Sequence, residues 1–230
     1  MQVNFEKIRK LDFRSNEAYK ALRTNIQFCG SDMKEICITS CMPNEGKSSV
    51  SFNLAMAFAE AGKKIVFIDA DLRKSVLFGR YQPDQAVLGL THYLSGQKSL
   101  EEVLYETNIE KLDFIFTGPE PPNPAELLGN ELFQQMMKKL REEYDYVIID
   151  TPPIGSVIDC AVVSEFCDGI IMVIESNAIS YKFAQRAKKQ LERGRCKFLG
   201  VVLNKTELNT KGYYGKYYRK YNAKYYGSYY

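Results

Sequence analysis

Residues 34–71 constrain the fold of this chain more than any other stretch. Positions 41–49 read CMPNEGKSS, after an apolar run at 36–38 and before apolar residues at 50, 54, 58 and 61 that recur with a helical period. A strand, a short loop containing Gly-Lys-Ser and a helix are the layout of a phosphate-binding loop, in which backbone amides and the positive end of the helix dipole face the phosphates. The stretch therefore predicts a nucleotide site at the start of this helix.

The residue types in the loop predict distinct roles. Lys47 would neutralise the β- and γ-phosphates, and the Ser48 hydroxyl would ligate Mg²⁺. The loop departs from the pattern G-x-x-x-x-G-K-[ST], because Cys41 stands where the first glycine is expected. The flanking strand and helix support the prediction in spite of this departure. The other loop residues expected to contact the nucleotide are Asn44, Glu45, Gly46 and Ser49.

Two further apolar runs end in carboxylates. Residues 65–68 lead to Asp69 and Asp71, and residues 146–149 lead to Asp150. Continuous apolar runs suit parallel strands that are buried on both faces, and ligands bind at the carboxyl ends of such strands. At positions i and i+2 of a strand, the first two carboxylates would point the same way. Asp150 ends a Walker B type strand, so it is expected to hold Mg²⁺ through water.

The order of the predicted elements indicates the fold class. Strands at 112–118, 169–174 and 198–205 alternate with helices, including one from Pro124 to Leu140 that Asn123 would cap. Such alternation predicts an α/β fold with an open, mostly parallel sheet flanked by helices on both faces. A chain of 230 residues with 45% hydrophobic content can bury one sizeable core.

A helix is predicted over about residues 15–28, with Ser15 as its cap. Glu17, Lys20 and Arg23 are spaced by three and share one face of this helix. Two interpretations stay open: a solvated face with weak internal ion pairs, or an interface with another subunit.

The composition changes after residue 208, which divides the chain into a body, 1–208, and a tail, 209–230. The tail has five Lys or Arg and no acid, so the body has a net charge of −2 although the whole chain has +3. From residue 212 onward no aliphatic side chain is larger than that of Ala, which predicts disorder. The tail alone is compatible with a nucleic-acid arm, a low-complexity segment or a set of phosphate acceptors.

Composition also bears on the compartment. No signal-like apolar stretch follows Met1, and no apolar run approaches the roughly 18 residues of a membrane span. The six cysteines lack C-x-x-C spacing, which indicates a reducing cytosol rather than a disulfide or zinc framework. A single histidine, His92, makes no metal cluster.

Together these motifs resemble those of the bacterial tyrosine kinases (BY-kinases) of capsule and exopolysaccharide biosynthesis, a branch of the P-loop MinD/ParA-like superfamily. Residues 43–48 resemble the family's Walker A motif, residues 67–73 its second, Asp-x-Asp motif, and residues 149–153 its Walker B motif. Residues 17–23 are similar to its Glu-x-x-Arg-x-x-Arg oligomerisation motif, with Lys20 in place of the first arginine. Lysine keeps the charge and loses the bidentate fork.

The resemblance implies an autokinase that uses ATP and Mg²⁺ and phosphorylates its own terminal tyrosines. Lys47, Asp69, Asp71 and Asp150 would be catalytic, with Asp69 accepting the tyrosine proton and with Ser48, Asp71 and Asp150 contacting the metal. By resemblance to related ATPases, Asn204 would recognise the adenine. The expected acceptors are Tyr213, Tyr214, Tyr217, Tyr218, Tyr221, Tyr225, Tyr226, Tyr229 and Tyr230.

The same resemblance implies partners and a location. They are a homo-oligomeric ring, a membrane activator of the polysaccharide co-polymerase type and a protein tyrosine phosphatase. The protein would be cytoplasmic and held at the inner face of the plasma membrane by its membrane partner.

Two other functions compete with this prediction. The first is a MinD/ParA-type scaffold ATPase without tyrosine kinase activity, a class that carries an extra lysine early in its phosphate loop; Cys41 and Met42 offer none. The second is nucleic-acid binding through the tail, which is disfavoured because the body is not basic. No nucleic-acid partner is therefore expected.

Overall fold

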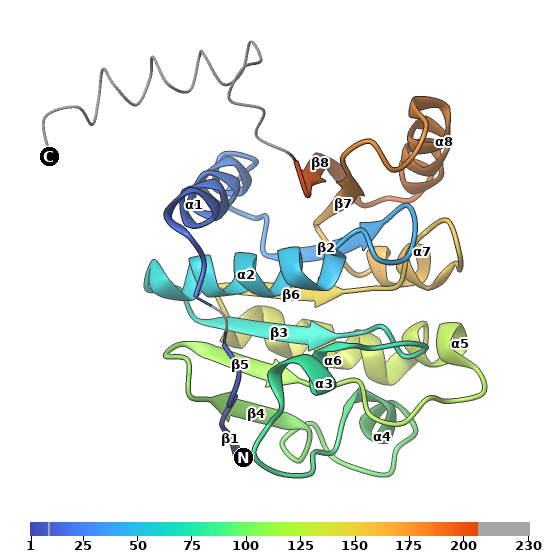
Figure 1. Ribbon diagram of the computed structural model, residues 1–230. Coiled ribbons are helices and arrows are strands. Elements are labelled where there is room, and N and C mark those ends of the chain that lie inside the picture. Colours follow the sequence, from blue (N-terminus) through green and yellow to red (C-terminus); the bar gives the residue numbers. More distant parts are fainter. Residues whose placement is uncertain (9, 207–230) are drawn as a thin grey trace, which may run out of the picture.

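A single sheet forms the centre of the computed structural model, which describes residues 1–8 and 10–206 (Figure 1). The order of its strands is β1-β4-β5-β3-β6-β2-β7-β8, and only the β4–β5 pair is antiparallel. The prediction of a mostly parallel sheet is therefore confirmed. The strands are β1 (Gln2–Val3), β2 (Glu35–Ser40), β3 (Ile65–Asp69), β4 (Leu104–Thr107), β5 (Leu112–Ile115), β6 (Tyr146–Asp150), β7 (Gly169–Glu175) and β8 (Lys197–Asn204).

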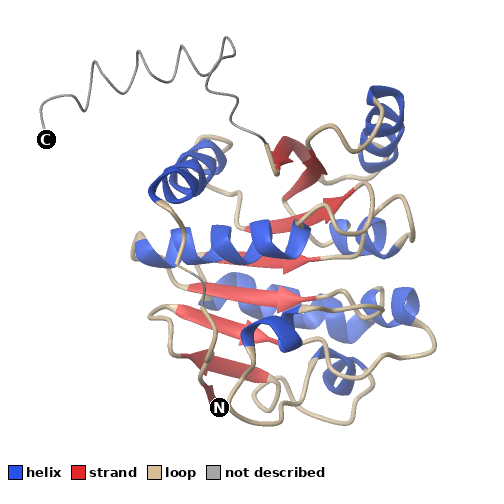
Figure 2. Cartoon of the chain, viewed as in Figure 1, coloured by secondary structure: helices blue, strands red, loops and turns tan. Residues whose placement is uncertain are grey.

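Helices cover both faces of the sheet. In Figures 1 and 2, α2 lies in front of the strands with α1 and α3 on the same side, while α5, α6 and α7 lie behind. The helices are α1 (Phe13–Gln27), α2 (Lys47–Glu60), α3 (Leu77–Tyr81), α4 (Leu90–Leu94), α5 (Pro124–Leu128), α6 (Glu131–Glu143), α7 (Asp159–Ser164) and α8 (Tyr181–Leu191).

The central strands contribute to two separate hydrophobic layers. Along β3, Ile65 and Phe67 pack in the layer under α2, whereas Val66 and Ile68 pack in the opposite layer. This alternation explains why the strand is apolar at successive positions: side chains alternate across a strand, and both of its faces are covered.

Two helix predictions need correction. The predicted 124–140 helix is two helices, because Gly129 ends α5 and the Asn130 side chain accepts a hydrogen bond from the Phe133 amide (2.9 Å), capping α6. The first helix starts at Phe13 and not at residue 15. Its N-cap is Asp12, whose carboxylate accepts a hydrogen bond from the Ser15 amide (2.9 Å). Ser15, the predicted cap, is therefore the donor in this bond and lies inside the helix.

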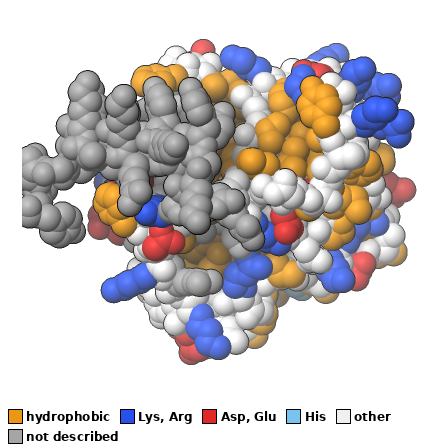
Figure 3. All heavy atoms as spheres, turned by 45° about the horizontal axis from the view of Figure 1, so that its top comes forward, with side chains coloured by type: hydrophobic (Ala, Val, Ile, Leu, Met, Phe, Trp, Pro, Cys, Tyr) orange, Lys and Arg blue, Asp and Glu red, His pale blue; other side chains and the backbone are white. Residues whose placement is uncertain are grey.

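β8 is an outer strand, and Val201 and Leu203 on it are 48% and 56% exposed. Figure 3, in which this side of the molecule comes forward, shows orange hydrophobic areas on the surface. Among the described residues, no helix is long and apolar enough to cross a bilayer. The boundary predicted at residue 208 and the tail tyrosines lie outside the described residues.

Candidate active site

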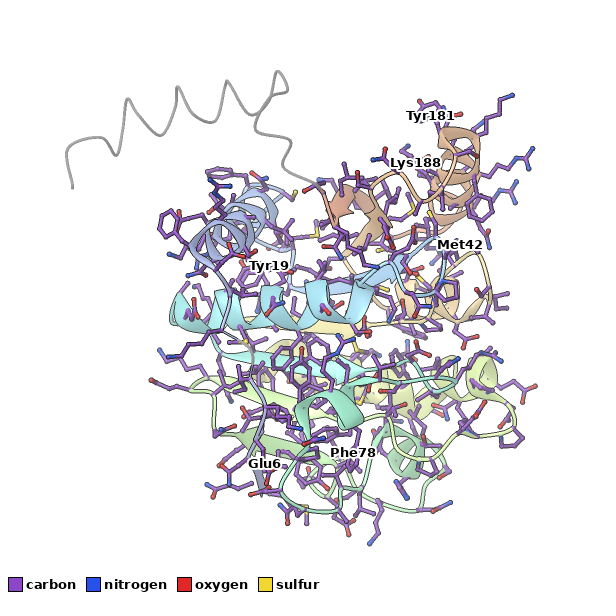
Figure 4. The ribbon with its side chains drawn as sticks, in the orientation of Figure 1. Glu6, Tyr19, Met42, Phe78, Tyr181 and Lys188 are labelled. Atoms are coloured by element: carbon purple, nitrogen blue, oxygen red, sulfur yellow. The ribbon has the colours of Figure 1, made fainter. Side chains whose placement is uncertain are left out.

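The phosphate loop lies between β2 and α2, at the carboxyl edge of the sheet, where Figure 4 shows Met42. Asn44 and Gly46 have φ angles of 68° and 87°, in the left-handed region. Asn is one of the few residues besides glycine that adopt this backbone readily. A Cβ atom on Gly46 would lie 2.1 Å from the Asn204 side-chain nitrogen, so the close approach also requires glycine.

Cys41, the departure from the loop pattern, has a packing role. Its side chain is fully buried, with Sγ 3.4 Å from Met172 Sδ, and its backbone does not have a positive φ. Burial, followed by the charge of Glu45, raises the pKa of the Cys41 thiol to about 12, so this thiol is protonated near neutral pH. Glycine is therefore not required at this position.

Glu45 and Asn204 brace the loop from within. The buried Glu45 carboxylate accepts from the amides of Met42 (2.7 Å) and Glu175 (3.3 Å), and the Asn204 amide donates to the Glu45 carbonyl (2.9 Å). These bonds tie the loop to the ends of β7 and β8. Both residues were predicted to contact the nucleotide, and their role in supporting the loop was not predicted.

Lys47 lies among carboxylates. Its Nζ is 2.8 Å from Asp150 Oδ2, 3.7 Å from Asp71 Oδ2 and 3.2 Å from Ser48 Oγ. Burial acts to lower the pKa of Lys47, but the nearby negative charges, that of Asp150 first, outweigh it and leave the pKa raised. The ammonium is therefore charged at neutral pH. Ser51, which the sequence did not single out, donates to Asp150 Oδ1 (2.8 Å).

Asp69 is the least satisfied group of the site. It is 1% exposed, Ser75 Oγ donates to its Oδ2, and its Oδ1 has no hydrogen-bond partner within the described residues. Burial, with the charge of Asp150 second, raises the pKa of Asp69 to about 8. A carboxylate in this state can gain a proton near neutral pH.

The i, i+2 argument assumed that Asp69 and Asp71 both lie on a strand, and only Asp69 does. Asp69 is the last residue of β3, so Asp71 lies in the following loop, where its Oδ1 accepts from the Lys74 amide (3.1 Å). The strand alternation rule no longer applies there. Both carboxylates still lie at the same edge as Asp150, whose Cα pairs with that of Asp69 across β3 and β6.

A second acid–base pair adjoins this loop. Arg73 contacts the buried Asp159, at the start of α7, through two hydrogen bonds of 2.8 and 2.9 Å. Arg73 belongs to the Asp-x-Asp motif at residues 67–73, and no partner was predicted for it. No sequence signal could have found the pair, because 86 residues separate its members.

The predicted oligomerisation row is not uniformly exposed. Glu17 and Lys20 form an ion pair of 2.8 Å, with both side chains about 40% exposed. Arg23, in contrast, donates from Nη1 to the Ala57 carbonyl on α2 (2.6 Å), and its Nε is buried. Arg23 therefore holds α1 against α2 within the chain.

The fold and the loop define the class of protein as a P-loop NTPase. The chimerical protein CapA2B2 matches with a TM-score of 0.81 and 32% identity over 90% of this chain and 94% of that chain. The kinase domain of the Escherichia coli tyrosine kinase ETK matches with a TM-score of 0.78 and 29% identity, and the match covers 90% of this chain and 87% of that chain. MinD of Pyrococcus horikoshii shares the fold, with a TM-score of 0.63 and 23% identity over 76% of this chain and 72% of that chain. Such a fold uses a nucleotide with a divalent metal ion.

Sequence relatives narrow this class. The AAA domain family matches residues 33–193. Tyrosine-protein kinase CpsD of Streptococcus agalactiae is 43% identical over 206 residues, covering 89% of this chain and 90% of that protein. Tyrosine-protein kinase YwqD of Bacillus subtilis (strain 168) is 40% identical over 205 residues, covering 88% and 86%. The chain belongs to the bacterial tyrosine kinases of capsule and exopolysaccharide formation, which favours the kinase prediction over the scaffold ATPase.

Proposed function

We propose that this chain transfers the γ-phosphoryl group of Mg²⁺-bound ATP to tyrosines of its own C-terminal segment, and so regulates polysaccharide polymerisation and export. The observation that carries the proposal is one buried ammonium among three carboxylates beside a phosphate loop. An enzyme of phosphoryl transfer needs mainly alignment and electrostatic stabilisation, which these residues can supply.

The residues present fit a magnesium nucleotide. Within the described residues, no three His, Cys, Asp or Glu side chains form a closed metal-binding group. Mg²⁺ is usually held by one or two carboxylates together with substrate phosphates and water, so a closed group is not required. Ser48, Asp71 and Asp150 would contact the metal directly or through water, and their oxygen atoms are the ligands it prefers. When bound, the metal neutralises charge on the phosphates.

Each side chain then has one task. Lys47 and the loop amides bind the phosphates and stabilise the charge that develops on them. Asp69 accepts the proton of the acceptor tyrosine, because its Oδ1 has no other partner within the described residues and its pKa is near 8. Asn204 would contact the adenine while its amide supports the loop.

A cavity beside Asp69 suits an aromatic acceptor. It has a volume of about 200 Å³, and among the described residues Asp69 is its only acidic lining residue. Phe78, which Figure 4 shows on α3, and Phe116 are among its apolar walls. A phenol needs such walls for its ring and one acceptor for its hydroxyl. The other lining residues are Val87, Thr117, Gly118 and Pro119.

Family membership supports three partners for this activity. These are further copies of the chain in a ring, a membrane activator of the polysaccharide co-polymerase type, and a protein tyrosine phosphatase. The location would be the cytoplasmic face of the membrane, through the activator. Each added phosphate contributes about −1.5 to −2 of charge, so phosphorylation would oppose the basic character of the tail and weaken ring contacts.

The test is to incubate the purified chain with Mg²⁺ and γ-labelled ATP and to follow the label. Label on residues 213–230, lost in Lys47→Met, supports the proposal. Free phosphate without labelled tyrosine would instead identify a scaffold ATPase. Label that persists on the tail in Lys47→Met would contradict the assigned site.

A further inference from the structure

We infer that Asp159 is a positioning residue, which holds Arg73 and thereby sets the separation of Asp71 and Asp150. The inference rests on the proposed function for its purpose, but it concerns the geometry of the magnesium contacts. Asp159 lies outside every motif that the sequence indicated, nine residues after Asp150.

The pair has directional geometry. Arg73 Nε donates to Asp159 Oδ2 (2.8 Å), and Nη2 donates to Oδ1 (2.9 Å). Two parallel bonds of this kind fix both the distance and the orientation of the partners. The carboxylate is fully buried, while 38% of the Arg73 side chain is exposed. Asp159 is therefore the fixed partner, and it holds Arg73 and the loop to which Arg73 belongs.

Stability alone is a weak explanation for this pair. Burying a carboxylate removes its hydration, and the attraction to its partner often does no more than offset that loss. Apolar side chains of similar size would hold α7 in place equally well. A bidentate ion pair adds a defined position for the residue that it binds, and Arg73 lies two residues beyond Asp71.

We call the Arg73–Asp159 pair the clamp. It joins the two segments that carry the proposed metal contacts. Arg73 lies in the loop after β3, and Asp159 begins α7, which follows β6, so their bonds connect the segments beyond the two strand ends. Next to Arg73, the Lys74 amide donates to Asp71 Oδ1 (3.1 Å). The other oxygen of Asp71 is left facing Lys47 at 3.7 Å. Releasing Arg73 would therefore free the Lys74 amide to move and Asp71 to turn away.

The experiment measures how much Mg²⁺ is needed for a fluorescent ADP analogue to bind the full chain. Groups that hydrogen-bond a metal ligand typically contribute about 10–100-fold to metal affinity. Asp159 acts on Asp71 through Arg73 and the Lys74 amide, so we expect Asp159→Asn to raise the half-saturating Mg²⁺ concentration about 10-fold, the low end of that range. Arg73→Gln should do the same, and the double variant should be no worse than the more affected single variant. At saturating Mg²⁺, the KM for ATP should change less than kcat.

Arg141→Gln is the matched control, because the Arg141 side chain is exposed to about the same degree as that of Arg73 and pairs with Glu35 and Asp168 (2.6 Å) from a different helix, α6. It should lower the thermal midpoint and leave the Mg²⁺ dependence unchanged. Equal Mg²⁺ dependence of wild type and either clamp variant, or additive effects in the double variant, would overturn the inference. If Asp159→Asn does not fold, Arg73→Gln carries the test alone, because its side chain is partly exposed.

Binding of the ADP analogue needs no phosphoryl transfer. The experiment can therefore contradict the positioning role of Asp159 without contradicting the proposed kinase function, and the reverse. A wild-type chain that binds Mg²⁺-nucleotide without labelling tyrosine would remove the proposed function and leave the clamp testable. A chain that labels tyrosine with unaltered Mg²⁺ dependence in both clamp variants would remove only the clamp.

Discussion

The two edges of the sheet use the same kinds of charged side chains and differ in how they are paired. At the amino edge, Arg141 contacts both Glu35 and Asp168, and Asp168 Oδ2 also accepts from the amides of Lys34 (2.8 Å) and Glu35 (3.0 Å). These carboxylates have donors within the chain. Buried charges that are paired and hydrogen-bonded in this way maintain a structure.

At the carboxyl edge, one cation faces three carboxylates, whereas at the amino edge Arg141 faces two. One ammonium, that of Lys47, serves Asp71 and Asp150, while Asp69 Oδ1 has no donor within the described residues. Like charges held together in low dielectric repel unless a cation or proton is added. Within the described residues, an excess of carboxylates with one oxygen unpaired therefore distinguishes the edge that can take a ligand from the edge that holds the fold.

The largest expected effect comes from removing the ammonium. Lys47→Met should reduce tyrosine labelling by about two to three orders of magnitude, because a lost electrostatic contact to the transition state typically has an effect of this size. The measurement is the initial rate of label transfer at saturating Mg²⁺-ATP. Arg141→Gln, the equivalent loss of a cation at the amino edge, should retain the wild-type rate.

The next effect concerns Asp69 and pH. Its pKa is raised from an ordinary value near 4 to about 8, so the folded state binds more protons than the unfolded state in this window. The free energy of unfolding of the ligand-free chain should therefore fall as pH rises from 4 to 8, by at most about 1.4 kcal/mol per pH unit for one proton. Asp69→Asn should remove this one-proton contribution to the slope, measured by urea unfolding.

The same titration should appear in the kinetics. As the proposed base, Asp69 must be ionised, so kcat/KM should rise with pH through about 8. Asp69→Asn should reduce transfer by about two orders of magnitude, the low end of the usual contribution of a general base, while the chain still binds the nucleotide. A kcat/KM profile that is flat between pH 6 and 9 would assign the proton to another group.

A smaller effect is expected in the phosphate loop. Cys41→Gly restores the usual loop pattern, yet it removes a fully buried side chain that packs on Met172. The cavity and the added backbone freedom should lower the free energy of unfolding by about 1–3 kcal/mol. Chemical denaturation measures this change. A more stable variant would show that the loop is strained by its cysteine.

The smallest effect belongs to the amino edge. Burial, then the charge of Asp168, raises the pKa of Glu35 to about 7, so stability should decline as pH rises from about 4 to 7. Glu35→Gln should flatten that part of the stability profile, measured by thermal unfolding across this range. Labelling activity should be unchanged. Any loss of labelling would show that the two edges are coupled.

Much of this architecture was readable in the chain. The continuous apolar runs, the helical period of about 3.6, the Gly-Lys-Ser loop and two strands that end in Asp predict the fold and its ligand edge. Local chemistry was less secure. Asn130 starts a new helix and Asp12 caps α1, since short polar side chains compete for the same amides and the outcome depends on packing.

The amino-acid order by itself determined which residue types meet at the carboxyl edge, because parallel strands deliver their ends to one side. Only the tertiary structure decided how they pair. Ser51 with Asp150, Arg73 with Asp159, and Arg23 with α2 join positions 34 to 99 residues apart. The physical reason is that burial and hydrogen-bond geometry depend on three-dimensional distance, which periodicity along a chain does not encode.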